Sequence, residues 1–229
     1  MAQNMSLQSL PLFPLGLVLF PGGSLPLRIF EVRYLDMIGK CHKAGAPFGV
    51  VSLTSGSEVQ KPAAKGSVGD NDAANRGAQT FAPEAFHQVG TLATISEFSA
   101  PQPGFMVIRC TGTQRFRIER QERLNYGLWV SEVTRIADDT PLAVPDDLRR
   151  VADALDMIIS SLKSRGIPQA QLPFHPPYHF NDCAWVANRW CELLPLPPLQ
   201  KQQLMTLDNP LVRLELVSDI LVKAGIVAG

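Results

Sequence analysis

Two different periodicities divide this chain. Up to about Arg135, short apolar runs rich in β-branched and aromatic residues are separated by turn residues, which is the pattern of β-strands. The runs lie at residues 10–20, 48–53, 89–98, 105–110, 114–119 and 128–133. Many short strands in succession are typical of a small barrel. We therefore predict a β-barrel over residues 1–137.

The first strands lead directly into a helix. An apolar run from Leu10 is followed by Pro21-Gly22-Gly23, a combination that favours a tight reversal, and then by alternating residues up to Ile29. From Glu31 the apolar spacing becomes helical, and Gly45 can end the helix. Residues 28–34 therefore form a polar junction between strand and helix, which we call the elbow.

Helical spacing dominates from Pro145 onward. Apolar residues recur at intervals of three and four over residues 148–162, and Gly166-Ile167-Pro168 can end that helix. Further helices are predicted at about 182–194, after Pro197-Pro198, and from Asp208-Asn209-Pro210, where Asp208 can cap the helix. We predict a helical bundle over residues 145–229, and an α+β class for the whole chain.

The segment from Gly56 to Gln88 has a different composition from its surroundings. It is rich in Gly, Ala, Asn, Ser and Lys and offers little to a core. We predict a long surface loop here. A hairpin of two irregular arms, with Phe81 and Phe86 at its base, is the structured alternative.

Taken together, several segments resemble the N-terminal, substrate-recognition domain of the Lon protease family, and especially the short bacterial proteins that consist of this domain alone. The resemblance is carried by four stretches in order: LPLFPLGLVLFPGGSLPLRIFEVRYLDMI at 10–38, VGTLATISEF at 89–98, FMVIRCTGTQRFRI at 105–118 and LPLPPLQKQQLMTLDNPLVRLELVSDIL at 194–221. It covers most of the chain outside residues 56–88. It implies a barrel of the pseudouridine-synthase-associated (PUA-like) type followed by a helical half.

Charge and cysteine content narrow the classes of function. The 229 residues contain 21 basic and 21 acidic side chains, so the broad basic surface of a nucleic-acid-binding or membrane-surface protein is not expected. The apolar run at residues 10–20 is too short to span a bilayer and is interrupted by prolines. The four cysteines lie in apolar periodic segments, which favours a reducing compartment. We therefore expect a cytoplasmic protein.

Catalytic motifs are missing from the sequence. Gly39-Lys40 lacks the rest of a phosphate-binding loop, and neither a G-x-S-x-G elbow nor an H-E-x-x-H helix occurs. Full-length Lon proteases carry ATPase and Ser-Lys peptidase modules after the domain that this chain resembles, and neither module is recognisable here. The expectation is a protein without enzymatic activity and without a cofactor.

Two alternatives from other functional classes remain open. A metal-dependent hydrolase would use His175, His179, Cys183 and Cys191, which are suitable zinc ligands but lack the spacing of a closed zinc site. The expected role of these cysteines is packing in the bundle. An RNA-binding protein would use a local basic patch of Arg115, Arg117, Arg120 and Arg123, although a solvated strand face is the simpler interpretation of Arg115 and Arg117.

Aromatic residues supply candidates for partner contact. Trp129, Trp185 and Trp190 could line a groove for apolar peptide side chains, although tryptophans in periodic segments are usually core. Trp185 and Trp190 are five residues apart, about 140° round a helix, so both cannot face one narrow core stripe. One of the two is expected to be partly exposed.

The elbow is the preferred binding surface. Its residues Arg28, Phe30, Glu31, Arg33 and Tyr34 match the RIFE-x-RY run of the single-domain relatives. Arginine forks and an aromatic ring could hold a peptide backbone or carboxylate, whereas a purely structural Arg28–Glu31 pair is the alternative. The predicted function is recognition of unfolded or apolar polypeptide segments, with a protease or chaperone as further partner. A homodimer is left open.

Overall fold

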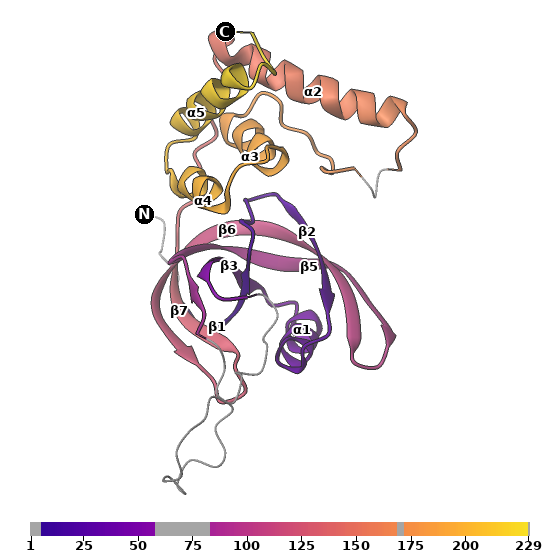
Figure 1. Cartoon of the computed structure of the whole chain (residues 1–229), viewed down its shortest axis with the longest axis vertical. Helices are drawn as coiled ribbons and strands as arrows, with labels where there is room; N and C mark the ends of the chain where they lie inside the picture. Colours follow the sequence, from indigo (N-terminus) through magenta and orange to yellow (C-terminus); the bar gives the residue numbers. More distant parts are fainter. Residues whose placement is uncertain (1–5, 58–82, 169–171, 229) are drawn as a thin grey trace, which may run out of the picture. The chain divides into compact units, whose positions relative to one another are not determined.

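The structure is a computed structural model that describes residues 6–57, 83–168 and 172–228. Within these ranges the chain has an α+β fold with a seven-stranded sheet and five α-helices (Figure 1). Its contacts divide it into two compact units. Unit 1 comprises Met1–Leu19 and Leu25–Ile136, and unit 2 comprises Phe20–Ser24 and Ala137–Gly229.

Unit 1 contains the seven strands of the described residues, except that Ser24, the first residue of β2, belongs to unit 2. They are β1 (Ser6–Leu15), β2 (Ser24–Ile29), β3 (Phe48–Ser55), β4 (Ala85–Phe86), β5 (Val89–Gln102), β6 (Phe105–Arg123) and β7 (Trp129–Arg135). The strand order is β1-β7-β6-β5-β3-β4, β2 pairs with β6, and β1 also pairs with β3 in parallel. The pairings therefore return to β1 through β7, β6, β5 and β3. The first two strands do not form a hairpin, because β2 joins the sheet at β6.

One strand is longer than predicted. We expected two strands, at 105–110 and 114–119, separated by a turn, but β6 is continuous over both. Ala93 of β5 faces Gly112 and Thr91 faces Arg115, so one more residue lies on β6 than on β5 between these positions. The Gly112 region is a β-bulge inside a strand, which explains why its composition resembled a turn.

Helix α1 (Val32–Ala44) confirms the predicted helix after the elbow. Gly45 ends it in the left-handed conformation at φ 61°, as the sequence indicated. Its inner face contributes Tyr34, Met37, Ile38 and Cys41 to a core that also contains apolar residues of β1, β2, β3, β5 and β6. The elbow is therefore attached to a hydrophobic core cluster of unit 1.

Unit 2 contains the remaining helices. A short 3-10 turn (Asp146–Leu148) leads into α2 (Arg149–Ser164), followed by α3 (Cys183–Leu193), α4 (Pro198–Thr206) and α5 (Pro210–Lys223). All four predicted helices are thus present. Helix α3 is buried on most sides, including Arg189 and Trp190. No helix within the described ranges has the length and apolar character needed to cross a membrane.

Two predicted details of unit 2 change. Asn209, and not Asp208, caps α5, because its side-chain oxygen accepts from the amides of Leu211 and Val212. The apolar stripe of α2 is buried at Val151, Leu155 and Ile159, whereas Ile158 and Leu162 are only partly buried. The stripe therefore turns away from the core toward the end of α2.

The predicted loop at 56–88 lies mostly outside the described residues, since 58–82 and with them Phe81 are not described. Its last part includes β4, which pairs with β3 and buries Phe86. Phe86 packs edge-on against Trp129, with ring centroids 5.4 Å apart. At least this end of the segment is anchored to the sheet.

Candidate functional site

The elbow contains both exposed and buried residues. Arg28 is exposed at the end of β2, Phe30 is 54% exposed, and Val32, at the first position of α1, is 82% exposed. Glu31 is partly buried, and Arg33 and Tyr34 are buried at 6% and 2% exposure. The structure thus divides the five candidate residues between surface and interior.

Arg33 makes an extensive set of contacts in the interior. Its guanidinium donates to Glu31 Oε2 at 3.1 Å, to the carbonyl of Gly127 at 2.9 Å and to Glu84 Oε1 at 3.4 Å. It also lies over the Tyr34 ring, 4.3 Å from the centroid. Glu31 therefore pairs with Arg33 in this structure, in contrast to the Arg28–Glu31 pair considered from the sequence.

Glu84 is the centre of this network. Only 3% of its side chain is exposed, and it accepts from Arg33, from Arg123 at 3.4 Å and from the indole nitrogen of Trp129 at 2.9 Å. Two arginines thus surround one buried carboxylate, and each guanidinium also lies over an aromatic ring. Trp129 takes part in this network, so its indole is a structural donor.

Tyr34 is a core residue. Its ring stacks on Phe13, with centroids 3.9 Å apart and planes inclined by 13°. Burial strongly raises the pKa of the Tyr34 hydroxyl, and the neighbouring Arg33 lowers it by a smaller amount. Tyr34 stays neutral and anchors α1 to β1. In this conformation Arg33 and Tyr34 position the elbow and offer no surface to a partner.

The Arg33 bond also joins the elbow to a turn that carries a second exposed aromatic residue. Gly127 lies in the turn between β6 and β7, where its amide donates to the Leu124 carbonyl at 2.7 Å. Its neighbour Tyr126 is 49% exposed. We call Arg28, Phe30, Val32 and Tyr126 the elbow patch. Val32 and Tyr126 were not predicted, because nothing local marks an apolar residue at a helix start or in a turn as exposed.

The two tryptophans of α3 have different environments. Trp190 is 2% exposed, and its indole nitrogen donates to the Val151 carbonyl of α2 at 2.9 Å. Trp185 is partly exposed and is surrounded edge-on by four rings at centroid distances of 5.2 to 6.4 Å, namely Phe174, Tyr178, His179 and Phe180. One of the pair is thus partly exposed, as predicted, and it is Trp185.

Arg189 holds the Pro-Gly-Gly turn in unit 2. Its guanidinium donates to the carbonyls of Pro21 and Gly22 and to Glu192 Oε1. Gly22 has a φ of 76°, a conformation that favours glycine, and a Cβ there would lie 3.1 Å from Arg189 Nη1 and crowd the guanidinium. Burial of this site raises the pKa of Glu192 to about 7 and lowers the pKa of Arg189.

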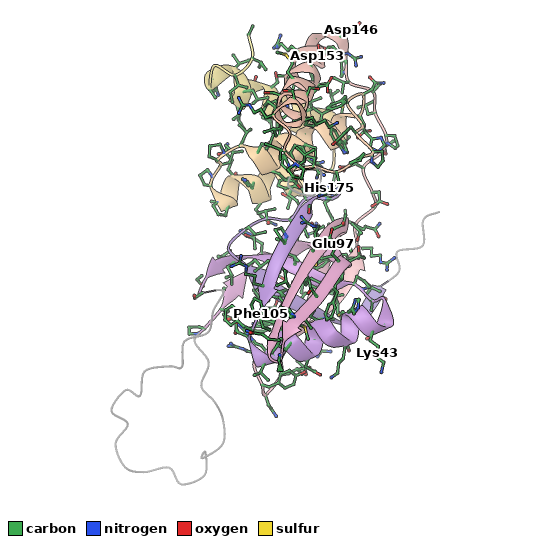
Figure 2. All side chains as sticks on the ribbon, turned by 90° about the vertical axis from the view of Figure 1, so that its right-hand side faces the viewer. Lys43, Glu97, Phe105, Asp146, Asp153 and His175 are labelled. Atoms are coloured by element: carbon green, nitrogen blue, oxygen red, sulfur yellow. The ribbon has the colours of Figure 1, made fainter. Side chains whose placement is uncertain are left out.

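The proposed metal ligands are not brought together. His175 lies in the loop between α2 and α3 (Figure 2), and His179 is exposed beside Trp185. Cys183 is buried and contacts the Ala143 carbonyl, while burial raises the pKa of the Cys191 thiol to about 12. Within the described ranges, no three His, Cys, Asp or Glu side chains are arranged to hold a metal ion. The hydrolase alternative therefore has no geometric support.

The predicted basic patch of four arginines contains both buried and exposed side chains. Arg115 is 3% exposed, and Arg123 contacts Glu84, whereas Arg117 and Arg120 are exposed. The solvated face expected for Arg115 and Arg117 is wrong for Arg115. Both residues pair with β5 in continuous register, at Thr91 and Val89, but only Arg117 is exposed. Two of the four arginines, Arg115 and Arg123, thus interact with the interior of unit 1.

The strands and helices define a mixed α+β protein in which a closed path of strand pairings is followed in sequence by four helices. A family model of the ATP-dependent protease La (LON) substrate-binding domain matches residues 9–223, so the chain belongs to this family. No curated protein matches the chain.

Solved structures show the same relationship. The chain is similar to a Lon N-terminal domain protein from Xanthomonas campestris, with 29% identity and a TM-score of 0.66, over 93% of this chain and 98% of that one. It is also similar in fold to the N-terminal domain of the Mycobacterium avium complex Lon protease, with 16% identity and a TM-score of 0.52, over 93% and 97% of the two chains.

Proposed function

We propose that this chain is a non-catalytic module that binds unfolded or apolar polypeptide segments at the elbow patch. The observation that carries this proposal is the exposure of Phe30 and Val32 next to the buried Arg33 network, in a chain of the Lon substrate-binding family. Exposed large apolar residues supported by a rigid framework are typical of contact surfaces.

Binding would use the patch in two ways. Apolar side chains of the polypeptide would lose water against Phe30, Val32 and Tyr126, and Arg28 would donate to carbonyl or carboxylate oxygens. The bonds of Arg33 to Glu31, Glu84 and Gly127 fix the patch before binding, which reduces the entropic cost of association.

The architecture that we propose for the module is a PUA-like barrel at 1–137 and a helical bundle at 145–229. The path of pairings through β1, β7, β6, β5 and β3 supports the barrel, and the division of contacts after Ile136 supports the boundary. A cytoplasmic protease or chaperone would receive the bound polypeptide, and a homodimer is compatible with this role.

The test compares binding of a fluorescently labelled, permanently unfolded polypeptide, reduced and carboxymethylated lactalbumin, to wild type and to a Phe30→Ser, Val32→Ser variant. Both residues are exposed, so the variant keeps the fold. Removing two apolar contacts worth together about 1–2 kcal/mol weakens binding about five- to thirtyfold. Met157→Ser, at a residue 73% exposed on α2, is the matched control and binds like wild type.

Two results would reject the proposal. One is equal affinity of wild type and the double variant, which would place any polypeptide binding elsewhere. The other is the absence of binding by either folded protein at concentrations well above micromolar.

A further inference from the structure

Arg28 and Phe30 lie on the same side of the chain where β2 leads into the elbow. Exposure alternates along this stretch, since Pro26, Arg28 and Phe30 are exposed, whereas Leu25 and Ile29 are buried. A step of two residues along an extended chain is about 7 Å. The elbow patch therefore presents a guanidinium and an aromatic ring as neighbours at a defined spacing.

The carboxylates in and around the elbow are already paired. Glu31 and Glu84 both accept from Arg33, at 3.1 and 3.4 Å. In the second turn of α1, Asp36 pairs with Lys40 at 2.7 Å. Each of these negative charges thus lies beside a cation of the chain itself and adds little to the charge that a ligand meets.

Arg28 differs from these charged residues. It has no ion pair or hydrogen bond among the described residues, and it is exposed. A guanidinium offers several N–H donors in a planar fork that matches the two oxygens of a carboxylate. The charge that the elbow patch offers to a ligand is therefore positive and comes from Arg28.

We propose that Arg28 determines the charge specificity of the elbow patch and selects segments with an acidic residue two positions from a large apolar residue. This inference rests on the proposed function. Because side chains two apart in an extended polypeptide have the spacing of Arg28 and Phe30, a segment whose apolar side chain covers Phe30 brings a carboxylate at that position to the guanidinium. An acidic residue next to the apolar one points to the other side, and a basic residue at the favoured position meets a like charge.

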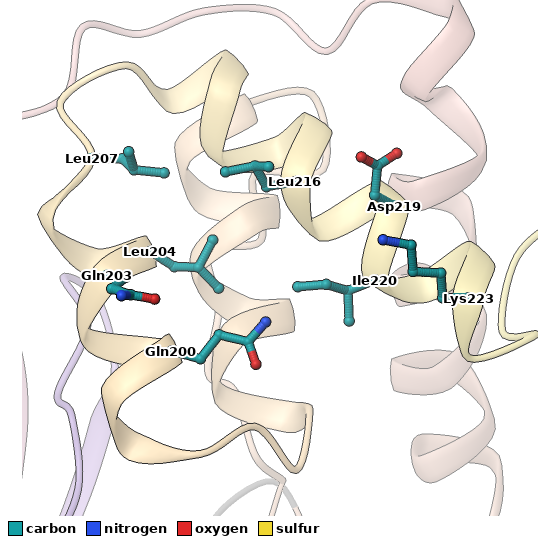
Figure 3. A pocket seen from close by; sticks show the side chains of 8 residues that line it. All are labelled: Gln200, Gln203, Leu204, Leu207, Leu216, Asp219, Ile220 and Lys223. Atoms are coloured by element: carbon teal, nitrogen blue, oxygen red, sulfur yellow. The ribbon is translucent and has the colours of Figure 1, made fainter.

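The apolar hollow between α4 and α5 in unit 2 has a different charge pattern (Figure 3). It is lined by apolar residues such as Leu216 and Ile220, and α5 adds both Asp219 and Lys223. Charges of both signs beside one apolar surface give no net preference for acidic or basic segments. This hollow therefore serves as an internal contrast to the elbow patch.

The test uses acetylated and amidated peptides that bind to the full chain, followed by NMR at the methyl signals of Val32. The probe is Gly-Asp-Ser-Leu-Ser-Asp-Gly, which has an acidic residue two positions from leucine in either chain direction. In two counterparts, asparagine or lysine replaces both aspartates. A third, Gly-Ser-Asp-Leu-Asp-Ser-Gly, keeps the charge but moves it next to leucine.

The aspartate probe should bind about threefold more tightly than the asparagine peptide and about tenfold more tightly than the lysine peptide, as expected for an exposed charge pair. The shifted peptide should bind like the asparagine peptide. Arg28→Gln removes the preference and Arg28→Glu reverses it, while both variants still bind the asparagine peptide. Arg165→Glu, which changes an exposed arginine of unit 2, is the matched control and keeps the preference of the wild type.

The possible failures can be told apart. Equal binding of all four peptides, lost in Phe30→Ser, Val32→Ser, would refute the role of Arg28 and leave the proposed function intact. No binding of any peptide or of unfolded polypeptide would reject both. Equal affinity of the shifted peptide and the probe would refute the spacing. A preference that persists in Arg28→Glu but is lost in Leu216→Ser would overturn the proposal by assigning the selection to the hollow of unit 2.

Discussion

Removal of the Glu84 carboxylate should strongly destabilise unit 1. In a Glu84→Ala variant, the Arg33 guanidinium and the Trp129 indole lose a hydrogen-bond acceptor. This acceptor is buried, since only 3% of the Glu84 side chain is exposed. Loss of one partner of a buried ion pair typically costs about 3–5 kcal/mol. Arg33 keeps its bonds to Glu31 and to the Gly127 carbonyl, so the lower end, about 3 kcal/mol, is expected.

Hydrogen exchange followed by mass spectrometry measures this loss of stability for each unit separately. A loss of about 3 kcal/mol accelerates exchange of protected amides in β6 and β7 about a hundredfold. Peptides from α3 and α5 serve as an internal reference. Glu84→Gln, which keeps an acceptor for Trp129 but removes the charge, falls between the wild type and the alanine variant.

The exposed pair Asp36–Lys40 is the matched control. Its side chains are 53% and 74% exposed, so Asp36→Asn changes stability by less than about 0.5 kcal/mol. If exchange in unit 1 of Glu84→Ala remains within threefold of this control, the network does not hold the elbow, and the rigidity assumed for the elbow patch is refuted.

Two further predictions concern unit 2. Trp190→Phe removes the donor to the Val151 carbonyl and core volume, so urea unfolding of unit 2 should show a loss of about 1–3 kcal/mol; a loss below about 0.5 kcal/mol would contradict the core assignment. Because the pKa of Glu192 is raised from 4.5 to about 7, its contribution to stability is complete below pH 4.5 and is lost as the pH rises through 7. The loss of stability is at most about 3 kcal/mol, and the urea midpoint of Glu192→Gln should not show this decline with pH. If the urea midpoints of wild type and Glu192→Gln change with pH in the same way, Glu192 is not the cause.

Much of the fold could be predicted from local patterns. The start and end of α1 and α5 follow from a period change, a left-handed glycine and a proline in the first turn, all of which depend on neighbours in sequence. The continuous β6 could not be predicted, because Gly112 has the same composition signal in a bulge as in a turn. The pairing of β2 with β6 depends on long-range contacts that no local pattern encodes.

Only part of the exposure pattern of the elbow residues could be predicted. Arg28 and Phe30 are exposed, as a contact surface requires, but Arg33 is buried. Its burial could not be predicted, because its partner carbonyl at Gly127 is 94 residues away in sequence. The same applies to Arg189, whose acceptors at Pro21 and Gly22 are more than 160 residues away. A guanidinium that donates to main-chain carbonyls leaves no charge pattern in the sequence, so such arginines resemble surface residues.

This use of arginine changes the expected chemistry of the elbow. From the sequence, arginine forks and an aromatic ring were expected to bind the polypeptide together. In the structure Arg33 is fixed inside by Glu31 and Glu84, whereas Phe30 and Val32 are at the surface. Charged side chains that are already paired contribute little to the free energy of binding a new partner. Exposed apolar surface contributes favourably whenever an apolar segment covers it. Recognition at the elbow should therefore depend on the hydrophobicity of the polypeptide much more than on its charge.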